Sequence, residues 1–308
     1  MKNNVRSLFN SLEERKYRRL DTDISTDLYV GIFDKKYCFV VRGNTKRINF
    51  KSSLVVDIRI EQFSISQKQL IFSLNNEKYF DIFLKFINDV IETLKQTRHS
   101  HIDVAYERWL LWKNVFSGNK EIFSEKQIRG LLAELYFMKK ELASKVGICN
   151  AVYSWGGPNF HKKDFEIQDQ WFEVKSSFNK NLIIKISSLS QLDSEVPGVL
   201  VIVDLEKTTT LNVHGVNILY LINEIMDQIE DLTVRELFVS KLSNLNFSYD
   251  EKLREYCFEI KELSYFKVDD SFPRLTSKNV AAEIVNCKYE LDRLSLEKYK
   301  IEKWWKND

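Results

Sequence analysis

The sequence predicts a mixed α/β (α+β) protein with more than one domain, and three observations support this prediction. Short alternating apolar segments fill residues 1–75, apolar residues at helical spacing follow, and a helix, a hairpin and buried strands alternate over residues 124–206. With 308 residues, of which 44% are hydrophobic and 13% aromatic, the chain can bury sizeable cores. Only three prolines and nine glycines interrupt it, which argues against a long flexible linker.

The pattern predicts three regions. We expect an N-terminal domain of β-sheet and helices at 1–115, a central core at 116–210 and a C-terminal, mostly helical extension with some strand at 211–308. In the first region four strand patterns are separated by turn-like residues at Asp34-Lys35 and Gly43-Asn44, which predicts an antiparallel sheet. The four patterns are DLYVGIFD, KYCFVVRG, LVVDIRIEQF and KQLIFSL. Two amphipathic helices follow at 79–96 and 102–116 and are expected to pack on that sheet.

The central region opens with a helix, SEKQIRGLLAELYFMKKEL, for which Ser124 is a favourable N-cap. Glu134 interrupts its apolar surface. A carboxylate at that place either reaches a cation or turns outward to water. Gly130, one turn earlier, would allow another backbone to approach closely.

The segments DFEI and WFEVKSS then predict a β-hairpin. With a two-residue turn at Asp169-Gln170, Glu166 faces Glu173 and Asp164 faces Lys175, because side chains alternate between the faces of a strand. The apolar residues fall together on the other face: Phe165, Ile167, Phe172 and Val174. Three carboxylates on one face repel one another unless a cation lies among them, so the hairpin predicts a metal site.

An exposed acidic hairpin is the ordinary alternative, since 29% of the residues are charged. The spacing also occurs a second time, with Asp250 nine residues before Glu259-Ile260-Lys261. The connecting segment EKLREYCF has no turn residues and would keep Asp250 off a paired strand. The first copy is therefore favoured by its surroundings and not by its spacing.

After the hairpin, NLIIKISSLSQLD predicts a buried strand followed by a helical turn bearing Gln191, and VPGVLVIVDL predicts a second buried strand. Beyond residue 210 the patterns predict two helices, at 215–230 and 234–245, and a strand at 254–268. The chain closes near Trp304-Trp305.

Composition excludes several classes. The four cysteines lack CxxC spacing, which argues against a zinc site or a disulfide framework and for the cytoplasm. The N-terminus is too polar for a signal sequence, and no apolar run approaches membrane-spanning length, so we expect a soluble protein without membrane association. Neither GxSxG nor a Walker loop is present. The net charge of +2 is nearly neutral, whereas nucleic-acid binders often carry a strong basic excess.

The motifs GLLAELYF, DFEI, EVKSS and ISSLSQLD, with a WGGP loop before them, resemble the core of the PD-(D/E)XK nuclease superfamily. The chain is similar to prokaryotic PD-(D/E)XK motif proteins, which are met beside restriction and phage-defence genes. This resemblance implies a restriction-endonuclease-like core with a central mixed sheet flanked by helices. It departs from the superfamily motif at Lys163, where the name-giving proline would stand.

The resemblance also implies roles for individual residues. Asp164 and Glu173 would bind Mg²⁺, for which Mn²⁺ can substitute, together with the Val174 carbonyl oxygen. Lys175 would orient the attacking water. The helical Glu134 and the Gln191 beside the lysine would complete the catalytic set. A shift by one position, with Glu166 in place of Asp164 as the ligand, stays open.

From the residues themselves, a basic cluster next to Asp164 is a candidate for phosphate contact. It comprises His161, Lys162 and Lys163. Together these observations predict a Mg²⁺-dependent DNA endonuclease of a restriction-like or phage-defence system, with partner proteins of that system or a second copy of the chain as further expected partners. Two alternatives are a catalytically inactive scaffolding or DNA-binding subunit, and a nuclease that acts on RNA or recognises a particular nucleic-acid structure.

Overall fold

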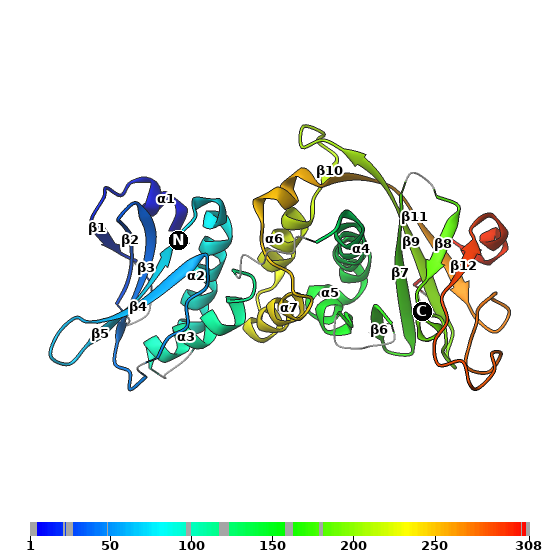
Figure 1. Cartoon of the computed structure of the whole chain (residues 1–308), viewed down its shortest axis with the longest axis horizontal. Coiled ribbons are helices and arrows are strands. Elements are labelled where there is room, and N and C mark those ends of the chain that lie inside the picture. The colour runs from blue at the N-terminus through cyan, green and yellow to red at the C-terminus, as the bar shows by residue number, and fades with distance from the viewer. Residues whose placement is uncertain are drawn as a thin grey trace. The chain divides into compact units, whose positions relative to one another are not determined.

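The computed structural model describes residues 5–20, 22, 27–47, 49–96, 100–116, 123–157, 163–178, 181–302 and 304–305. The chain forms two compact units. The first comprises residues 1–122 and 242–251, and the second comprises residues 123–241 and 252–308. Both combine helices with sheets (Figure 1), which confirms the predicted α+β class.

The first unit is built on an antiparallel sheet of five strands in the order β1-β2-β3-β5-β4. The strands are β1 (Lys16–Arg19), β2 (Leu28–Phe33), β3 (Lys36–Gly43), β4 (Val56–Gln62) and β5 (Lys68–Leu74). The four predicted strands are confirmed, and so is the turn at Asp34 and Lys35, where both residues adopt positive φ. Strand β1 was not predicted, because KYRR is exposed throughout and shows no alternation.

Helices cover one face of this sheet. They are α1 (Val5–Asn10), the 3₁₀ turn η1 (Glu77–Tyr79), α2 (Phe80–Lys95) and α3 (His101–Trp112). Phe39 and Phe72 of the sheet pack their rings against Phe86 of α2. Between the two predicted helices, Arg108 and Asp89 form a buried bidentate ion pair, with N–O distances of 2.8 and 2.9 Å.

The second unit contains a mixed sheet in the order β10-β11-β9-β7-β6, with β13 also paired to β11. Strands β7 and β9 run parallel, and the other neighbours run antiparallel. The strands are β6 (Phe165–Ile167), β7 (Gln170–Phe178), β9 (Gly198–Thr208), β10 (Gly215–Val216), β11 (Cys257–Val268) and β13 (Lys300–Ile301). Because β7 and β9 are parallel, the chain must cross back over the sheet between them.

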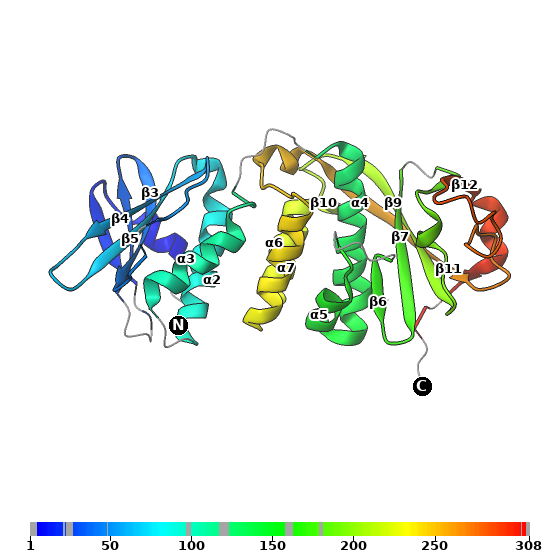
Figure 2. The same cartoon turned by 60° about the horizontal axis from the view of Figure 1, so that its bottom comes forward.

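Helix α4 lies along β7 on one face of this sheet (Figure 2). It begins with the predicted N-cap, since Ser124 and Gln127 form a reciprocal capping box. The helices of the second unit are α4 (Glu125–Tyr136), the π-helical η2 (Phe137–Leu142), α5 (Ala143–Ser154), α6 (Ile218–Gln228) and α7 (Leu232–Asn244) as far as Lys241. Helix α5 was not predicted. Gly130 of α4 has open space where a Cβ would stand, so the predicted close approach of another backbone is wrong.

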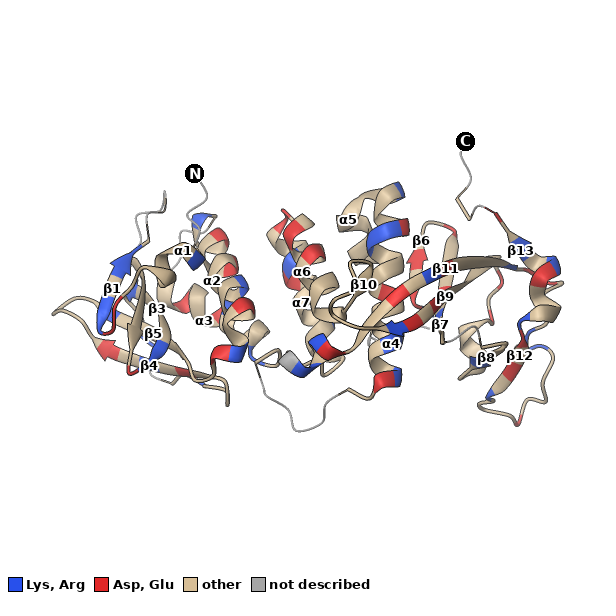
Figure 3. Ribbon diagram, turned by 90° about the horizontal axis from the view of Figure 1, so that it is seen from above, with Lys and Arg blue, Asp and Glu red and all other residues tan. Residues whose placement is uncertain are grey.

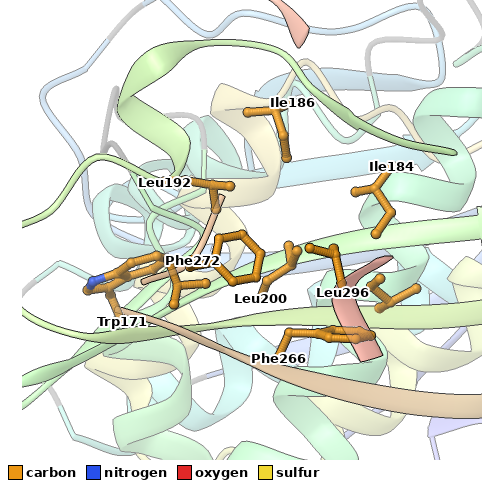
Figure 4. Packing of buried hydrophobic residues seen from close by; sticks show 10 residues of the cluster. Trp171, Ile184, Ile186, Leu192, Leu200, Phe266, Phe272 and Leu296 are labelled. Atoms are coloured by element: carbon orange, nitrogen blue, oxygen red, sulfur yellow. The ribbon is translucent and has the colours of Figure 1, made fainter. Parts of the chain in front are cut away.

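The crossover between β7 and β9 packs on the opposite face. It contains β8 (Ile183–Ile186) and η3 (Leu189–Gln191), and β8 pairs with β12 (Tyr289–Asp292). Remaining short turns are η4 (Glu251–Glu255) and η5 (Leu294–Tyr299). Figure 4 shows the apolar cluster beneath the crossover, in which Ile184, Ile186 and Leu192 meet Trp171 and Leu200. The Trp171 ring lies across Gly198, where an added Cβ would be 2.1 Å from the indole.

One expectation needs correction. The segment around β8 is not a fully buried strand of the main sheet, because alternate residues are exposed and its partner is β12. Residues 211–308 contribute helices and also a strand of the main sheet, since β11 pairs with β9 from Cys257 to Val268. The other predicted elements are confirmed: β9, α6, α7, β11 and the turn η3. Among the described residues, no helix has both the length and the apolar character needed to cross a bilayer.

Candidate active site

Most of the predicted site residues meet at the edge of β7 where its partner β6 begins. Among the described residues, β6 pairs with β7 only as far as Phe172, and beyond it the Asp164 carboxylate takes the place of a backbone partner. Its Oδ2 accepts a hydrogen bond of 2.7 Å from the Val174 N–H. The N–H and C=O of one strand residue point to the same edge, so the Val174 carbonyl is directed toward Asp164.

The hairpin turn lies at Gln168 and Asp169, and not at the predicted Asp169-Gln170. Glu166 consequently faces Trp171 instead of Glu173. Neither dipeptide carries the Asn-Gly or Asp-Gly signature that fixes a turn, and Gln168 itself adopts the positive φ of 52°. A displacement by two residues leaves every side chain on its predicted face. Asp164, Glu173 and Lys175 therefore still share a face.

Glu173 and Lys175 form an ion pair on β7 in which the glutamate is buried and the lysine is half-buried. The Lys175 Nζ lies 2.7 Å from Glu173 Oε1, and the Glu173 side chain is 1% exposed. Burial, followed by the charge of Asp164, raises the pKa of Glu173 to about 8 in spite of this contact. Burial alone would lower the pKa of Lys175, but the Glu173 and Asp164 carboxylates raise it. The lysine is therefore charged at neutral pH.

Helix α4 supplies the third carboxylate, Glu134. Its Oε2 accepts a 2.8 Å hydrogen bond from the Trp155 indole N–H. Burial first, and the nearby Asp164 second, raise the pKa of Glu134 well above its usual value. Burial also raises the pKa of Asp164, against the opposing effects of Lys175 and the Val174 N–H. The carboxyl groups therefore form one electrostatic cluster.

Trp155 is a site residue that the sequence reasoning did not single out. It follows α5, forms a bridge with Phe165, and its neighbour Gly156 donates its N–H to the Asp164 carbonyl at 2.8 Å. This pairing sets the start of the hairpin against the end of α5. The WGGP motif was the available signal, but nothing in it shows that the indole reaches Glu134.

A second buried contact fixes the end of α5. Lys241 of α7 is 6% exposed and donates to the carbonyls of Val152, Tyr153 and Trp155. Burial lowers its pKa to about 8. A cation at the C-terminal end of a helix is favourably placed, so Lys241 holds the segment that carries Trp155.

Lys163 has a different role from the predicted phosphate contact. Its side chain is buried, and its Nζ donates to the carbonyls of Ser190, Gln191 and Asp193 at 2.8, 2.8 and 3.1 Å. The ammonium also lies 3.9 Å from the Trp171 ring centroid. The Lys163 ammonium therefore binds the carbonyls of the crossover and does not reach the surface, where a phosphate could contact it. His161 and Lys162 lie outside the described residues.

The structure does not bring Gln191 or Glu166 into the carboxylate cluster. The Gln191 Oε1 accepts the Ser187 N–H at 2.7 Å, so this side chain closes the turn after β8. The Glu166 side chain is exposed opposite Trp171. Of the two alternatives that the sequence leaves open for the metal ligand, the geometry favours Asp164 over Glu166.

The second copy of the Glu-x-Lys spacing is a ready comparison. On β11, the Lys261 Nζ lies 2.8 Å from Glu259 Oε1, but both side chains are partly exposed. The hydrogen bond from Lys261 lowers the pKa of Glu259, opposite to the shift at Glu173. As predicted, Asp250 is not part of a strand. Burial beside other carboxylates distinguishes the first copy.

The donor set suits Mg²⁺, because carboxylate and carbonyl oxygens are the ligands this ion prefers and mutually raised pKa values indicate a shortage of positive charge. In the described part of the chain, no three His, Cys, Asp or Glu side chains form a ready-made metal site. Glu173 instead contacts Lys175. Two cavities, of about 410 and 750 Å³, lie elsewhere and are lined by none of the candidate residues.

Comparisons with known proteins place the chain in a family. No curated protein and no solved structure matches the chain. A family model matches residues 2–293, which is nearly the whole chain. The protein therefore belongs to the family described as "Putative PD-(D/E)XK family member, (DUF4420)".

Proposed function

We propose that the protein is a Mg²⁺-dependent endonuclease that hydrolyses phosphodiester bonds of DNA at the β7 edge. The gathering of the buried Glu173 and the half-buried Asp164 beside Lys175 and Glu134 carries this proposal. A group of like charges with little access to water lowers the free energy of unfolding. The cluster is thus better explained by a cation and a substrate than by stability.

The topology supports a restriction-endonuclease-like core. Helix α4 lies along β7, the β6–β7 hairpin presents Asp164 and Glu173, and β9 returns parallel to β7. This is the order of helix, hairpin and strand that the resemblance implies. Membership in the PD-(D/E)XK-related family adds independent support.

Each residue has a chemical part in this proposal. When bound, Mg²⁺ would neutralise charge on the phosphate and lower the pKa of a water. Asp164 and Glu173 would hold the ion, with the Val174 carbonyl on the same strand edge. The charged Lys175 can donate to the attacking water or to a phosphate oxygen. Glu134, whose raised pKa favours a bound proton, can exchange that proton and is held by Trp155.

Cleavage of supercoiled plasmid by the full chain with Mg²⁺ or Mn²⁺ tests the proposal. Glu173→Gln and Lys175→Ala should each lower the cleavage rate by at least about a hundredfold. Glu259→Gln and Lys261→Ala, which alter the exposed pair of the same spacing, should retain it. Cleavage that persists in both site variants would overturn the assignment. Single-stranded RNA offered in parallel separates the two substrate classes.

One observation favours the second candidate, an inactive scaffold. Lys175 already forms an ion pair with the Glu173 carboxylate, and the described residues contain no cluster of side chains arranged to bind a metal ion. Calorimetric titration with Mn²⁺ separates the candidates. A nuclease should bind the ion and lose binding in Asp164→Asn, whereas a scaffold should release no heat that depends on Asp164.

We further propose that cleavage serves a restriction-like or phage-defence system in the cytoplasm, together with partner proteins of that system. The similarity to proteins met beside restriction and phage-defence genes supports this role. Phage plaque counts on cells expressing the wild type should fall relative to cells expressing Glu173→Gln. Equal counts for both, across a panel of DNA phages, would remove the defence role and leave the nuclease assignment standing.

A further inference from the structure

One face of the sheet in the first unit is left open by the helices. Phe39 of β3 points to the helix side, so its neighbours Cys38 and Val40 point to the other. A small cluster of Cys38, Val40 and Ile71 lies there, with Tyr29 and Phe33 packed beside it. Among the described residues, α1, α2 and α3 all lie on the Phe39 side (Figure 1).

Arg42 stands on this open face between two aromatic rings. Its guanidinium carbon lies 4.0 Å from the Tyr29 ring centroid and 3.6 Å from that of Phe63. Within the described part of the chain, the Arg42 Nε is buried without a hydrogen-bond partner. The two rings hold the guanidinium in place, and a guanidinium that is held in place suits a two-pronged contact with an external acceptor.

Other arginines of this unit that lie over rings are completed by carboxylates. Arg6 lies over Phe80 and pairs with Asp81, and Arg47 lies over Tyr106 near carboxylates of α3. Arg42 forms no such ion pair with any described residue. Contact with two rings leaves the Arg42 guanidinium charged and does not use its N–H donors. We therefore expect a molecule outside the chain to supply the acceptor.

Further basic and aromatic groups surround Arg42 on the same face. Tyr17 and Phe63 are 40% and 45% exposed. The Tyr17 ring lies across Gly31, where a Cβ would be 2.3 Å from the ring, so it covers the sheet as a flat surface. Strand register places Arg19 and Arg59 on this face as well, together with the carboxylates of Asp57 and Glu61, and Arg19 pairs with Asp27 at 3.0 Å. Figure 3 shows the basic residues along β1 in blue.

From this combination we infer that the open face binds a single-stranded nucleic-acid segment. Arg42 donates to a phosphate or to the acceptor edge of a base, and Tyr17 and Phe63 stack on bases. Exposed rings among arginines are the features with which sheet surfaces bind unpaired strands. A duplex fits less well, since its major groove admits a helix or a two-stranded ribbon but not a five-stranded sheet.

This inference rests on the proposed action on nucleic acid and adds a contact surface in the first unit. It assigns to that unit the capture of an unpaired strand. Because binding can be measured without metal, its failure is distinguishable from failure of the nuclease proposal.

The test is fluorescence anisotropy of the full chain with labelled single-stranded DNA of about 15 nucleotides, in EDTA. Arg42→Gln should weaken binding by roughly tenfold or more. Phe63→Leu, at an exposed position, should weaken it several-fold. Arg6→Gln makes the same change at a ring-stacked arginine that has a carboxylate partner and should bind like the wild type. The slope of log affinity against log salt should fall by about one in Arg42→Gln.

Competitors identify the occupant. Unlabelled single-stranded DNA or RNA should displace the probe, and the more effective of the two identifies the natural strand. Duplex DNA or polyglutamate competing as well as the single strand would overturn the inference. So would wild-type affinity in both Arg42→Gln and Phe63→Leu, or no binding of single strands by the wild type. Plasmid cleavage measured in parallel would in each case still report on the nuclease proposal.

Discussion

At the residue scale, the environment of Glu173 decides its chemistry. Glu173 and Glu259 both contact the lysine two positions onward, at 2.7 and 2.8 Å. Burial beside Asp164 raises the pKa of Glu173, whereas at the more exposed Glu259 the lysine lowers it. The same ion pair thus accompanies opposite shifts, because desolvation outweighs the lysine only at the buried site.

This pKa makes the stability of the metal-free protein depend on pH. Glu173 titrates near 4.5 when unfolded and near 8 when folded, so between these values the folded state binds more protons. The free energy of unfolding should therefore fall by a few kcal/mol as pH rises from about 4.5 to 8, and then stop changing from this cause. Urea denaturation in EDTA measures it. Glu173→Gln should remove much of the slope and Glu259→Gln none; equal slopes in all three proteins contradict the prediction.

Metal binding should show the complementary dependence. Ions bind the ionised carboxylates, so below pH 8 each bound ion displaces the proton of Glu173. The apparent affinity for Mn²⁺ should rise between pH 6 and 8 by up to about tenfold per pH unit. Calorimetry in buffers of different ionisation enthalpy counts the released proton directly. Affinity independent of pH would remove Glu173 from the ligand set.

At the element scale, buried lysines connect the elements around the site. Lys241 holds the end of α5, and Lys163 holds the turn η3. Each donates to three main-chain carbonyls, and burial lowers both pKa values to about 8. These contacts set the positions of Trp155 and Gln191 through their backbones.

Lys241→Met tests this connection, since it leaves carbonyls at the end of α5 without their donor. We expect a loss of roughly 2–4 kcal/mol in the free energy of unfolding. Because Trp155 then loses its backbone anchor, Mn²⁺ affinity should fall too. Lys145→Met, at an exposed position of α5, should change neither quantity. Unchanged Mn²⁺ affinity in a folded Lys241→Met would show that the anchor does not reach the site.

Two glycines of the second unit should respond oppositely to alanine. Gly198→Ala places a Cβ 2.1 Å from the Trp171 indole and should lower the free energy of unfolding by at least about 1–3 kcal/mol. Gly130→Ala meets open space within α4 and should raise it by up to about 1 kcal/mol. Urea midpoints of the two variants measure both effects. The same sign for both would contradict the packing described.

At the scale of the whole molecule, the first unit is built from two separate segments of the chain. Residues 242–251 belong with residues 1–122, and there Phe247 and Tyr249 are buried. The Tyr249 N–H donates to the Val115 carbonyl at 3.0 Å. The units are therefore not separable by a single cut.

A chain shortened to residues 123–308 should consequently aggregate, because Phe247 and Tyr249 lose the surface that covers them. Light scattering after purification measures this. Replacing both by serine in the shortened chain should restore solubility, whereas replacing the exposed Leu211 and Val213 should not. A soluble shortened chain without these changes would show that the segment does not need the first unit.

The sequence by itself determined most elements and was enough to name the candidate site residues. Local features depend only on residues that are close in sequence and can therefore be predicted from it. They include the helical and strand periodicity, the Ser124 cap and the Asp34-Lys35 turn. Asp164, Glu173, Lys175 and Glu134 followed from the hairpin, its preceding helix and a family resemblance. The gathering of these four side chains agrees with that expectation.

Only the tertiary structure decided the hairpin register, the partner of β8, the place of β11 in the sheet and the tasks of Lys163 and Trp155. Each depends on groups supplied by distant parts of the chain: β12 pairs with β8, and η3 carbonyls accept from Lys163. The pKa values of the carboxyl groups also depend on groups supplied by distant parts of the chain. Burial and electrostatic coupling are properties of assembled surfaces, so two identical Glu-x-Lys spacings become chemically different only once the chain has folded.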